Sequence, residues 1–138
     1  FEGIRELIAL LKQKGIIVVL ITGKGMNSCD ITLKQFNMKT SFTKVITGNA
    51  ERNIKAEALK GLLHDYHLAA NEIVYIGDAL SDITECRKAN VMCLSAAWSI
   101  PQNEVTTLEN CNPKNVFYSI PSLSDYLLVS DNRNNFAY

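Results

Sequence analysis

Short apolar segments alternate with amphipathic segments along this chain, and this alternation constrains its fold more than any other feature. Residues 16–21 read Ile-Ile-Val-Val-Leu-Ile, a run that is β-branched and apolar on both faces, as strands buried in parallel sheets are. The preceding residues 1–15 place apolar side chains at helical spacing from Ile4 onward and end at Gly15, a favoured helix stop. The chain is therefore predicted to open with a helix that leads into a buried strand.

The same alternation predicts the rest of the chain. We expect further strands at residues 44–46, 72–76, 91–94 and 116–118, a looser region before the last strand, and further helices at about residues 27–36, 55–66, 81–89 (with Ser81 as its cap) and 122–129. Strands that alternate with helices form a parallel, doubly wound sheet with helices on both faces. The predicted fold class is thus α/β and Rossmann-like, and residues 1–138 suit a single domain.

The composition excludes several classes of function. Lys and Arg together number 14, as do Asp and Glu, so no net charge directs the chain to a nucleic acid or membrane partner. The longest apolar run, residues 16–21, is far too short to span a bilayer. The four cysteines show no metal-ligand spacing, and we interpret them as free thiols of a protein in the reducing cytoplasm.

Polar residues follow two of the predicted strands, at the sheet edge where ligands of doubly wound folds bind. Thr22 and Gly23 end the first strand, and a hydroxyl beside backbone N–H groups freed by glycine can hold a phosphate; a turn that needs small residues is the alternative. Asp78 leaves the end of a later strand, with Asp82 in the next helical turn. Two converging carboxylates suit Mg²⁺. Helix capping is the alternative, more so for Asp82 than for Asp78.

Lys55 opens the helix that carries Leu59. A cation at a helix N-terminus opposes the helix dipole, and a phosphate or carboxylate partner would offset that unfavourable interaction. A solvated surface lysine is the alternative. His64 and His67 end the same helix, where an imidazole suits the dipole, and we expect no catalytic role for them.

Together these three groups resemble the motifs of the haloacid dehalogenase-like family, in particular its phosphoglycolate phosphatase-like branch. Leu20-Ile21-Thr22-Gly23 is similar to the second motif of that family, Lys55 to the third, and residues 77–82 to the acidic fourth. The helix that begins at residues 1–7 and the segment of residues 45–48 are similar to the flanking elements. The resemblance covers about residues 1–128.

The resemblance implies a Mg²⁺-dependent hydrolase, a phosphatase that acts on a small phosphorylated metabolite through an aspartyl-phosphate. In that scheme Thr22 and Lys55 are catalytic, and Thr22, Gly23 and Lys55 bind the phosphoryl group. The metal residues are Asp78, which ligates Mg²⁺, and Asp82, which ligates it or orients the site. A related sugar-phosphate mutase is an alternative reaction.

Two departures from the family pattern bear on this interpretation. Ala56 follows Lys55, where relatives often have proline. The larger departure is that no aspartate opens a DxDx[TV] motif, which carries the nucleophile in the family. The aspartates outside the acidic loop are Asp30, Asp65, Asp125 and Asp131. In the family this motif lies at the end of a central strand. The resemblance therefore implies that this strand and a small helical cap both precede Phe1.

A missing central strand would leave strand edges without partners, and unpaired buried N–H and C=O groups cost about 1–3 kcal/mol each. We therefore expect an upstream segment or another chain to fill the slot, or the strands that lead to Thr22 and Asp78 to pair directly. In each case residues 1–138 alone should show no phosphatase activity.

Two further interpretations stay open. The chain is a non-catalytic relative that binds a partner or phospho-ligand if its reading frame contains no upstream DxDx[TV] motif. It is an unrelated doubly wound domain if the side chains of Thr22, Lys55 and Asp78 lie more than about 12 Å apart, because they then cannot share one ligand.

Overall fold

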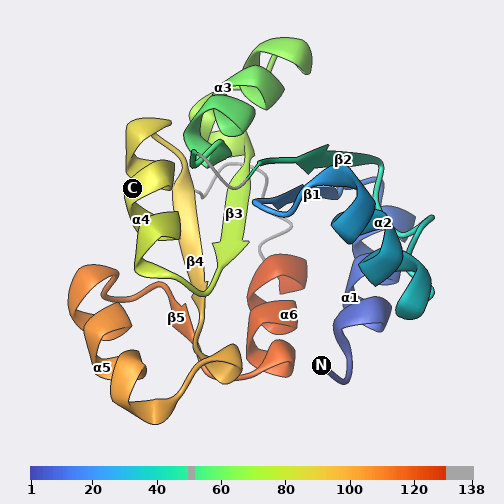
Figure 1. Ribbon diagram of the computed structural model, residues 1–138. Coiled ribbons are helices and arrows are strands. Elements are labelled where there is room, and N and C mark those ends of the chain that lie inside the picture. Colours follow the sequence, from blue (N-terminus) through green and yellow to red (C-terminus); the bar gives the residue numbers. More distant parts are fainter. Residues whose placement is uncertain (50–51, 130–138) are drawn as a thin grey trace. The chain divides into compact units, whose positions relative to one another are not determined.

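The computed structural model describes residues 1–49 and 52–129. Its elements fall into two compact units, Phe1–Ala58 (unit 1) and Leu59–Tyr138 (unit 2). Each unit has parallel strands and its own helices (Figure 1). One helix, α3 (Lys55–Asp65), begins in unit 1 and continues in unit 2.

Unit 1 consists of two helices, two strands and the first turn of α3. These elements are α1 (Ile4–Gln13), β1 (Val19–Thr22), α2 (Met26–Gln35) and β2 (Lys44–Thr47). The two strands are parallel, with Thr22 opposite Thr47, so both end at the same edge. α1 buries Leu7, Ile8 and Leu11, which is the apolar stripe that the sequence predicts.

The first strand begins later than the apolar run predicts. β1 starts at Val19, and Ile16 and Ile17 are 43% and 49% exposed. Gly15 adopts φ 78°, a left-handed conformation that glycine tolerates, and Ile16 N–H donates to Leu11 O at 3.0 Å. Because this N–H completes the cap of α1, it is not available for a strand ladder.

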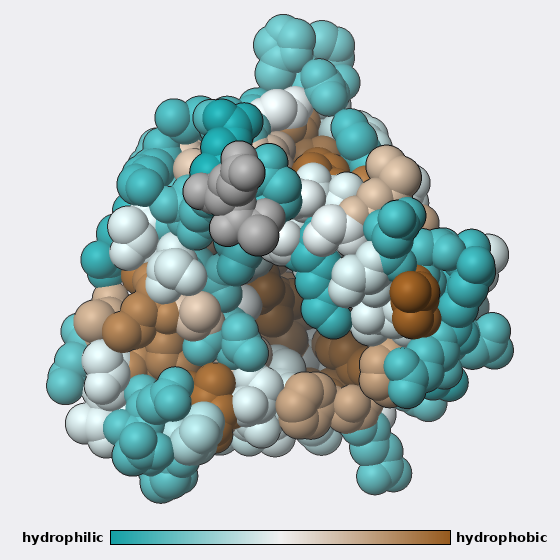
Figure 2. Space-filling view, in the orientation of Figure 1, coloured by the Kyte–Doolittle hydropathy of each residue, from teal (hydrophilic) through white to brown (hydrophobic). Residues whose placement is uncertain are grey.

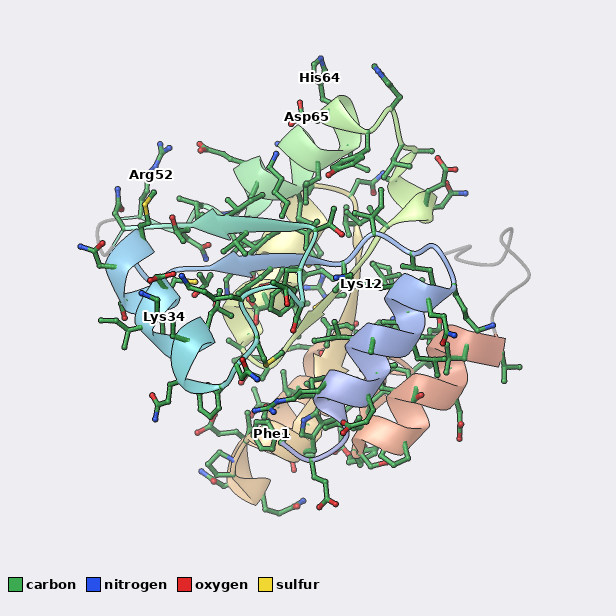
Figure 3. The ribbon with its side chains drawn as sticks, turned by 90° about the vertical axis from the view of Figure 1, so that its right-hand side faces the viewer. Phe1, Lys12, Lys34, Arg52, His64 and Asp65 are labelled. Atoms are coloured by element: carbon green, nitrogen blue, oxygen red, sulfur yellow. The ribbon has the colours of Figure 1, made fainter. Side chains whose placement is uncertain are left out.

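Unit 2 holds a three-stranded parallel sheet. After α3 come the 3₁₀-helix η1 (Ala70–Glu72), β3 (Val74–Gly77), α4 (Leu80–Lys88), β4 (Met92–Ala96), the 3₁₀-helix η2 (Ala97–Ser99), α5 (Gln102–Cys111), β5 (Val116–Phe117) and α6 (Ile120–Val129). The strand order is β3–β4–β5. α4 lies on one side of β3 and β4 and α6 on the other, as Figure 1 and Figure 3 show. This is the two-sided helix cover expected for a doubly wound sheet.

The sequence predicts only a looser region where α5 lies. This helix buries Val105 and Leu108, and two apolar residues at i, i+3 spacing are too few to mark a helix by periodicity. Its N-cap is Pro101, whose side chain offers no hydrogen-bond acceptor, so the usual start signal is missing as well.

The core of unit 2 contains aliphatic residues and cysteines. Leu94 and Leu123 are completely buried, and Cys86 and Cys93 are also buried. All four cysteines are free thiols. Cys86 and Cys93 therefore pack as small apolar residues.

α3 is the amphipathic helix that the sequence predicts, and it begins at Lys55 as expected. Leu59 and Leu62 are buried, and Figure 2 shows a hydrophilic surface over the outer side of this helix. No helix in the described part of the chain is long and apolar enough to cross a membrane.

The predicted α/β class with parallel strands is confirmed. The described strands form two sheets, in which β1 pairs with β2, and β3 pairs with β4. Direct pairing of β1 with β3, one of the arrangements expected from the sequence, is therefore not formed among the described strands. Within its own sheet, each of these two strands has a described neighbour on one side only.

Candidate functional site

The end of β1 presents a hydroxyl followed by a glycine turn. Thr22 is the last residue of β1, and the next three residues, which include Gly23 and Lys24, lead into α2. Lys24 N–H donates to Thr22 Oγ1 at 3.2 Å. This bond occupies one lone pair of the hydroxyl and leaves its hydrogen for another acceptor. A phosphoryl oxygen is an acceptor of this kind.

Gly48, the residue after β2, joins the turn at Gly23 to the start of α3. Its N–H donates to Lys24 O at 3.1 Å. A Cβ at this position would lie 3.2 Å from Gly23 Cα and 3.3 Å from Ile54 Cγ1, so the backbone approaches too closely here for most side chains. Lys55 follows Ile54, and unit 1 therefore places the predicted phosphate turn and the predicted lysine around the same glycine.

The N-terminus of α3 is positively charged. Lys55 N–H donates to Asn53 Oδ1 at 3.1 Å, so Asn53 caps this end of the helix. Arg52, labelled in Figure 3, forms an ion pair with Glu57 at 2.9 Å. The half-buried Lys55 adds its charge to the positive end of the helix dipole, and such a helix end attracts anions.

In unit 2 the carboxylate of Asp82 organises the loop between β3 and α4. Asp82 is 2% exposed, and its Oδ2 accepts the N–H groups of Asp78 and Ala79 at 3.1 Å each. An acidic side chain that reaches back from the first turn in this way caps the helix. The N-cap residue is Ala79, and the prediction of Ser81 is wrong, because Asp82 supplies the acceptor that a capping serine would have supplied.

Tyr75 supports the same carboxylate from β3. Its O–H donates to Asp82 Oδ1 at 3.3 Å. Burial raises the pKa of the Tyr75 phenol, and the Asp82 carboxylate raises it further, so the phenol stays protonated and remains the donor. A Cβ at Gly77 would overlap the Asp82 carboxylate and lie 2.7 Å from Tyr75 Cε1. Sequence reasoning missed Tyr75; the available signal is its i, i+2 spacing from Gly77, which puts both residues on one face of β3.

Asp78 carries an exposed carboxylate just beyond the end of β3. The Asp82 carboxylate holds the backbone N–H of Asp78. Asp78 Oδ2 accepts a hydrogen bond from the hydroxyl of Ser99 at 3.1 Å. Among the described residues of unit 2, its Oδ1 accepts no hydrogen bond, so one oxygen is open for a cation. Sequence reasoning also missed Ser99, which lies in the turn after β4.

The oxygen ligands can be compared with what Mg²⁺ requires. Residues 1–49 and 52–129 contain no group of three His, Cys, Asp or Glu side chains placed to hold one metal ion. Mg²⁺ is commonly held by one or two carboxylates, with water and substrate phosphate completing its octahedron. Asp78 fits such a ligand because it is exposed and has an open oxygen. Both oxygens of Asp82 accept hydrogen bonds from nearby groups, so the orienting role fits this residue better than direct ligation.

Asp30 is an ion-paired residue of α2. Its carboxylate lies 2.7 Å from Lys39 Nζ and 2.9 Å from Lys34 Nζ, and Figure 3 shows Lys34 on this helix. The hydrogen bonds from Lys39 and Lys34 lower the pKa of the Asp30 carboxyl below its usual value. These contacts describe a structural ion pair within unit 1.

The remaining aspartates outside the acidic loop do not follow a described strand either. Asp65 lies beside His64 at the C-terminal end of α3 (Figure 3), where the His64 side chain is 88% exposed. Asp125 is exposed on α6. Asp131 lies outside the described residues.

The structure has two hollows whose linings do not include Thr22, Lys55 or Asp78. One of about 320 Å³ in unit 1 is lined by residues of α2 and β2 that include Cys29 and Val45. The other, of about 360 Å³ in unit 2, is lined by Met92 and Asn115 among others. These two residues stand where β4 and β5 begin, at the sheet edge opposite the one that carries Asp78.

A family comparison covers the whole set of candidate residues. The model of the family described as haloacid dehalogenase-like hydrolase matches residues 1–96, a segment that contains Thr22, Lys55, Asp78 and Asp82. The chain belongs to this family. Ser99 lies just outside the matched segment.

Relatives of this family member include the phosphoglycolate phosphatase of Vibrio cholerae serotype O1, which is 28% identical over 132 residues. The match covers 94% of the chain and 58% of the relative, so the chain spans little more than half of that protein. A predicted phosphatase from Clostridium acetobutylicum has a TM-score of 0.78 at 19% identity, covering 94% of this chain and 60% of that one. A Thermotoga maritima protein provisionally assigned as a β-phosphoglucomutase has a TM-score of 0.75 at 15% identity, covering 95% and 60%. These likenesses confirm the fold.

Proposed function

We propose that this chain supplies the phosphate-binding and Mg²⁺-binding part of a phosphatase that acts on a small phosphorylated metabolite in the cytoplasm. The observation that carries the proposal is the carboxylate of Asp78. Asp82 fixes its backbone and Ser99 holds one oxygen, while the other oxygen accepts no hydrogen bond from the described residues of unit 2. A preorganised carboxylate of this kind suits a hard cation that neutralises phosphate charge.

The polar groups of unit 1 have complementary roles in this proposal. Thr22 donates its hydroxyl hydrogen to a phosphoryl oxygen, and the Gly23 turn adds backbone N–H groups. Lys55 binds the phosphoryl group and the attacking carboxylate, with its charge reinforced by the N-terminus of α3. Mg²⁺, when bound by Asp78, stabilises the negative charge that develops on the transferring group. Asp82 positions Asp78.

The nucleophile of the proposed reaction comes from outside residues 1–138. These residues contain no DxDx[TV] motif, and the V. cholerae phosphatase is considerably longer than the chain. In the proposed cycle an aspartate of that motif attacks phosphorus and forms an aspartyl-phosphate, a second aspartate protonates the leaving oxygen, and water hydrolyses the intermediate. A cap before Phe1 would select the substrate.

A phosphomutase acting on a sugar phosphate is a second candidate, favoured by the T. maritima neighbour. It would use the same Thr22, Lys55 and Asp78, but would transfer the phosphoryl group to a sugar hydroxyl in place of water. Product analysis with a sugar phosphate separates the two reactions, because only the phosphatase releases inorganic phosphate in proportion to turnover. A reading frame that lacks an upstream DxDx[TV] motif would instead favour a non-catalytic binding module.

Replacing Lys55 by alanine tests the proposed function. In the complete protein we expect Lys55→Ala to lower the hydrolysis rate of an aryl phosphate by about 10²-fold or more, because a preorganised charge on the transferring group is lost. Thermal unfolding should change little, since a lysine at a helix N-terminus opposes the dipole. Lys60→Ala, an exposed position on the same helix, is the matched control and should keep the rate. A Lys55→Ala protein that is less stable but turns over normally per folded molecule would show that the residue is structural.

A further inference from the structure

Ser99 contacts Asp78 from a different strand end. It closes η2, the single turn that follows β4, and its Oγ lies 3.1 Å from Asp78 Oδ2. Gly77 and Ser95 are opposite each other in the β3–β4 pair. This register places the residues that follow the two strands side by side, and the contact therefore depends on the sheet and not on the acidic loop alone.

The Ser99 hydroxyl has two acceptors for one hydrogen. One acceptor is Ala96 O, 2.9 Å from Ser99 Oγ, and the other is Asp78 Oδ2, at 3.1 Å. A serine has a single O–H to donate. A hydrogen bond to an ionised carboxylate is roughly twice as strong as one to a neutral carbonyl, so Asp78 is the favoured acceptor.

This bond makes the two oxygens of Asp78 unequal. Oδ2 is occupied by Ser99, and Oδ1 accepts no hydrogen bond among the described residues of unit 2. A cation that takes both oxygens of Asp78 must therefore compete with the Ser99 hydroxyl for Oδ2, whereas a cation that takes Oδ1 alone does not. Mg²⁺ takes carboxylates through single oxygens in a strict octahedron, whereas Ca²⁺ takes six to eight ligands and accepts both oxygens of one carboxylate.

We propose that Ser99 is a positioning residue that sets the cation specificity of this site, by holding Asp78 in one-oxygen coordination and thereby favouring Mg²⁺ over Ca²⁺. The inference rests on the proposed function, in which Asp78 is the Mg²⁺ ligand. Without the hydroxyl, Oδ2 is released and Asp78 can present both oxygens, which benefits Ca²⁺ and leaves Mg²⁺ with a less ordered ligand.

The test is a cation titration of the complete protein, followed through the backbone amide signals of Gly77, Asp78 and Ala79 in ¹H–¹⁵N NMR spectra. Separate Mg²⁺ and Ca²⁺ titrations give the ratio of the two dissociation constants for wild type, Ser99→Ala and Ser99→Thr. Ser81→Ala is the control, because Ser81 is exposed in the first turn of α4 and its hydroxyl makes no hydrogen bond among the described residues of unit 2. The same spectra report whether each variant is folded.

We expect Ser99→Ala to shift the ratio towards Ca²⁺ by about two- to tenfold, the equivalent of one hydrogen bond, with Ser99→Thr and Ser81→Ala like wild type. Equal changes for both cations, or no change, would overturn the role of Ser99 while leaving the metal site in place. Metal-induced shifts that persist in Asp78→Asn, or no shifts in wild type, would overturn the assignment of Asp78 and this inference with it.

Discussion

Replacing Asp78 by asparagine will abolish Mg²⁺-dependent phosphatase activity in the complete protein, with a loss of at least about 10²–10³-fold in rate. The substitution removes the negative charge from the one exposed carboxylate that both Asp82 and Ser99 position, and a neutral amide is a poor ligand for a hard cation. The fold should survive. The backbone N–H at this position can still donate to Asp82, and the amide oxygen can still accept the Ser99 hydroxyl.

Steady-state hydrolysis of an aryl phosphate over a range of Mg²⁺ concentrations measures this effect. Asp125→Asn removes an equivalent charge from an exposed position on α6 and should leave the rate and its Mg²⁺ dependence unchanged. Wild-type turnover by the Asp78→Asn protein would show that Asp78 is not the metal ligand.

Replacing Gly77 by alanine will lower the free energy of unfolding by about 3 kcal/mol or more. The new Cβ would overlap the Asp82 carboxylate, at 2.6 Å from its Cγ, and would lie 2.7 Å from Tyr75 Cε1. Overpacking of this kind costs about 1–3 kcal/mol. If Asp82 moves away to relieve it, the N–H groups of Asp78 and Ala79 lose their acceptor, at a further cost of about 1–3 kcal/mol for each one left unsatisfied.

Chemical denaturation of the chain measures this loss, and Gly61→Ala is the matched control. Gly61 lies inside α3, and a Cβ there would meet nothing within 4 Å. Alanine at a helix interior is favoured over glycine by up to about 1 kcal/mol, so this variant should be slightly more stable than wild type. A Gly77→Ala chain as stable as wild type would mean that Asp82 does not lie against Gly77.

The elements that could be predicted from the sequence are those whose apolar residues repeat at helical or strand spacing. The helices α1 and α3 follow from the helical spacing of their apolar residues. Ile16 and Ile17 are apolar and β-branched, which predicts a strand. In the structure the Ile16 N–H donates to Leu11 O and caps α1, so the strand starts later. α5 was missed because its two buried residues give too little pattern.

In the candidate site too, some features follow from local sequence and others depend on tertiary contacts. Thr22 and Asp78 were placed at strand ends from the sequence, and the structure puts them there. The contacts of Tyr75 and Ser99 were not predictable, because they depend on tertiary packing: Ser99 meets Asp78 across 21 residues through the β3–β4 register. Motif resemblance also does not separate ligation from orientation for Asp82, whereas its hydrogen bonds to the loop do.

We propose that the Thr22 turn, Lys55 and Asp78 bind one phosphate–Mg²⁺ ligand in the complete protein, and an NMR titration can establish whether they do. Inorganic phosphate is added to the complete protein in the presence of Mg²⁺, and the amide signals of Gly23, Lys55 and Asp78 are followed together. We expect all three signals to shift with a single dissociation constant, and we expect Asp78→Asn to weaken the response at Gly23 and Lys55. Separate constants for the three residues, or a response at Gly23 that is unaffected by Asp78→Asn, would contradict it.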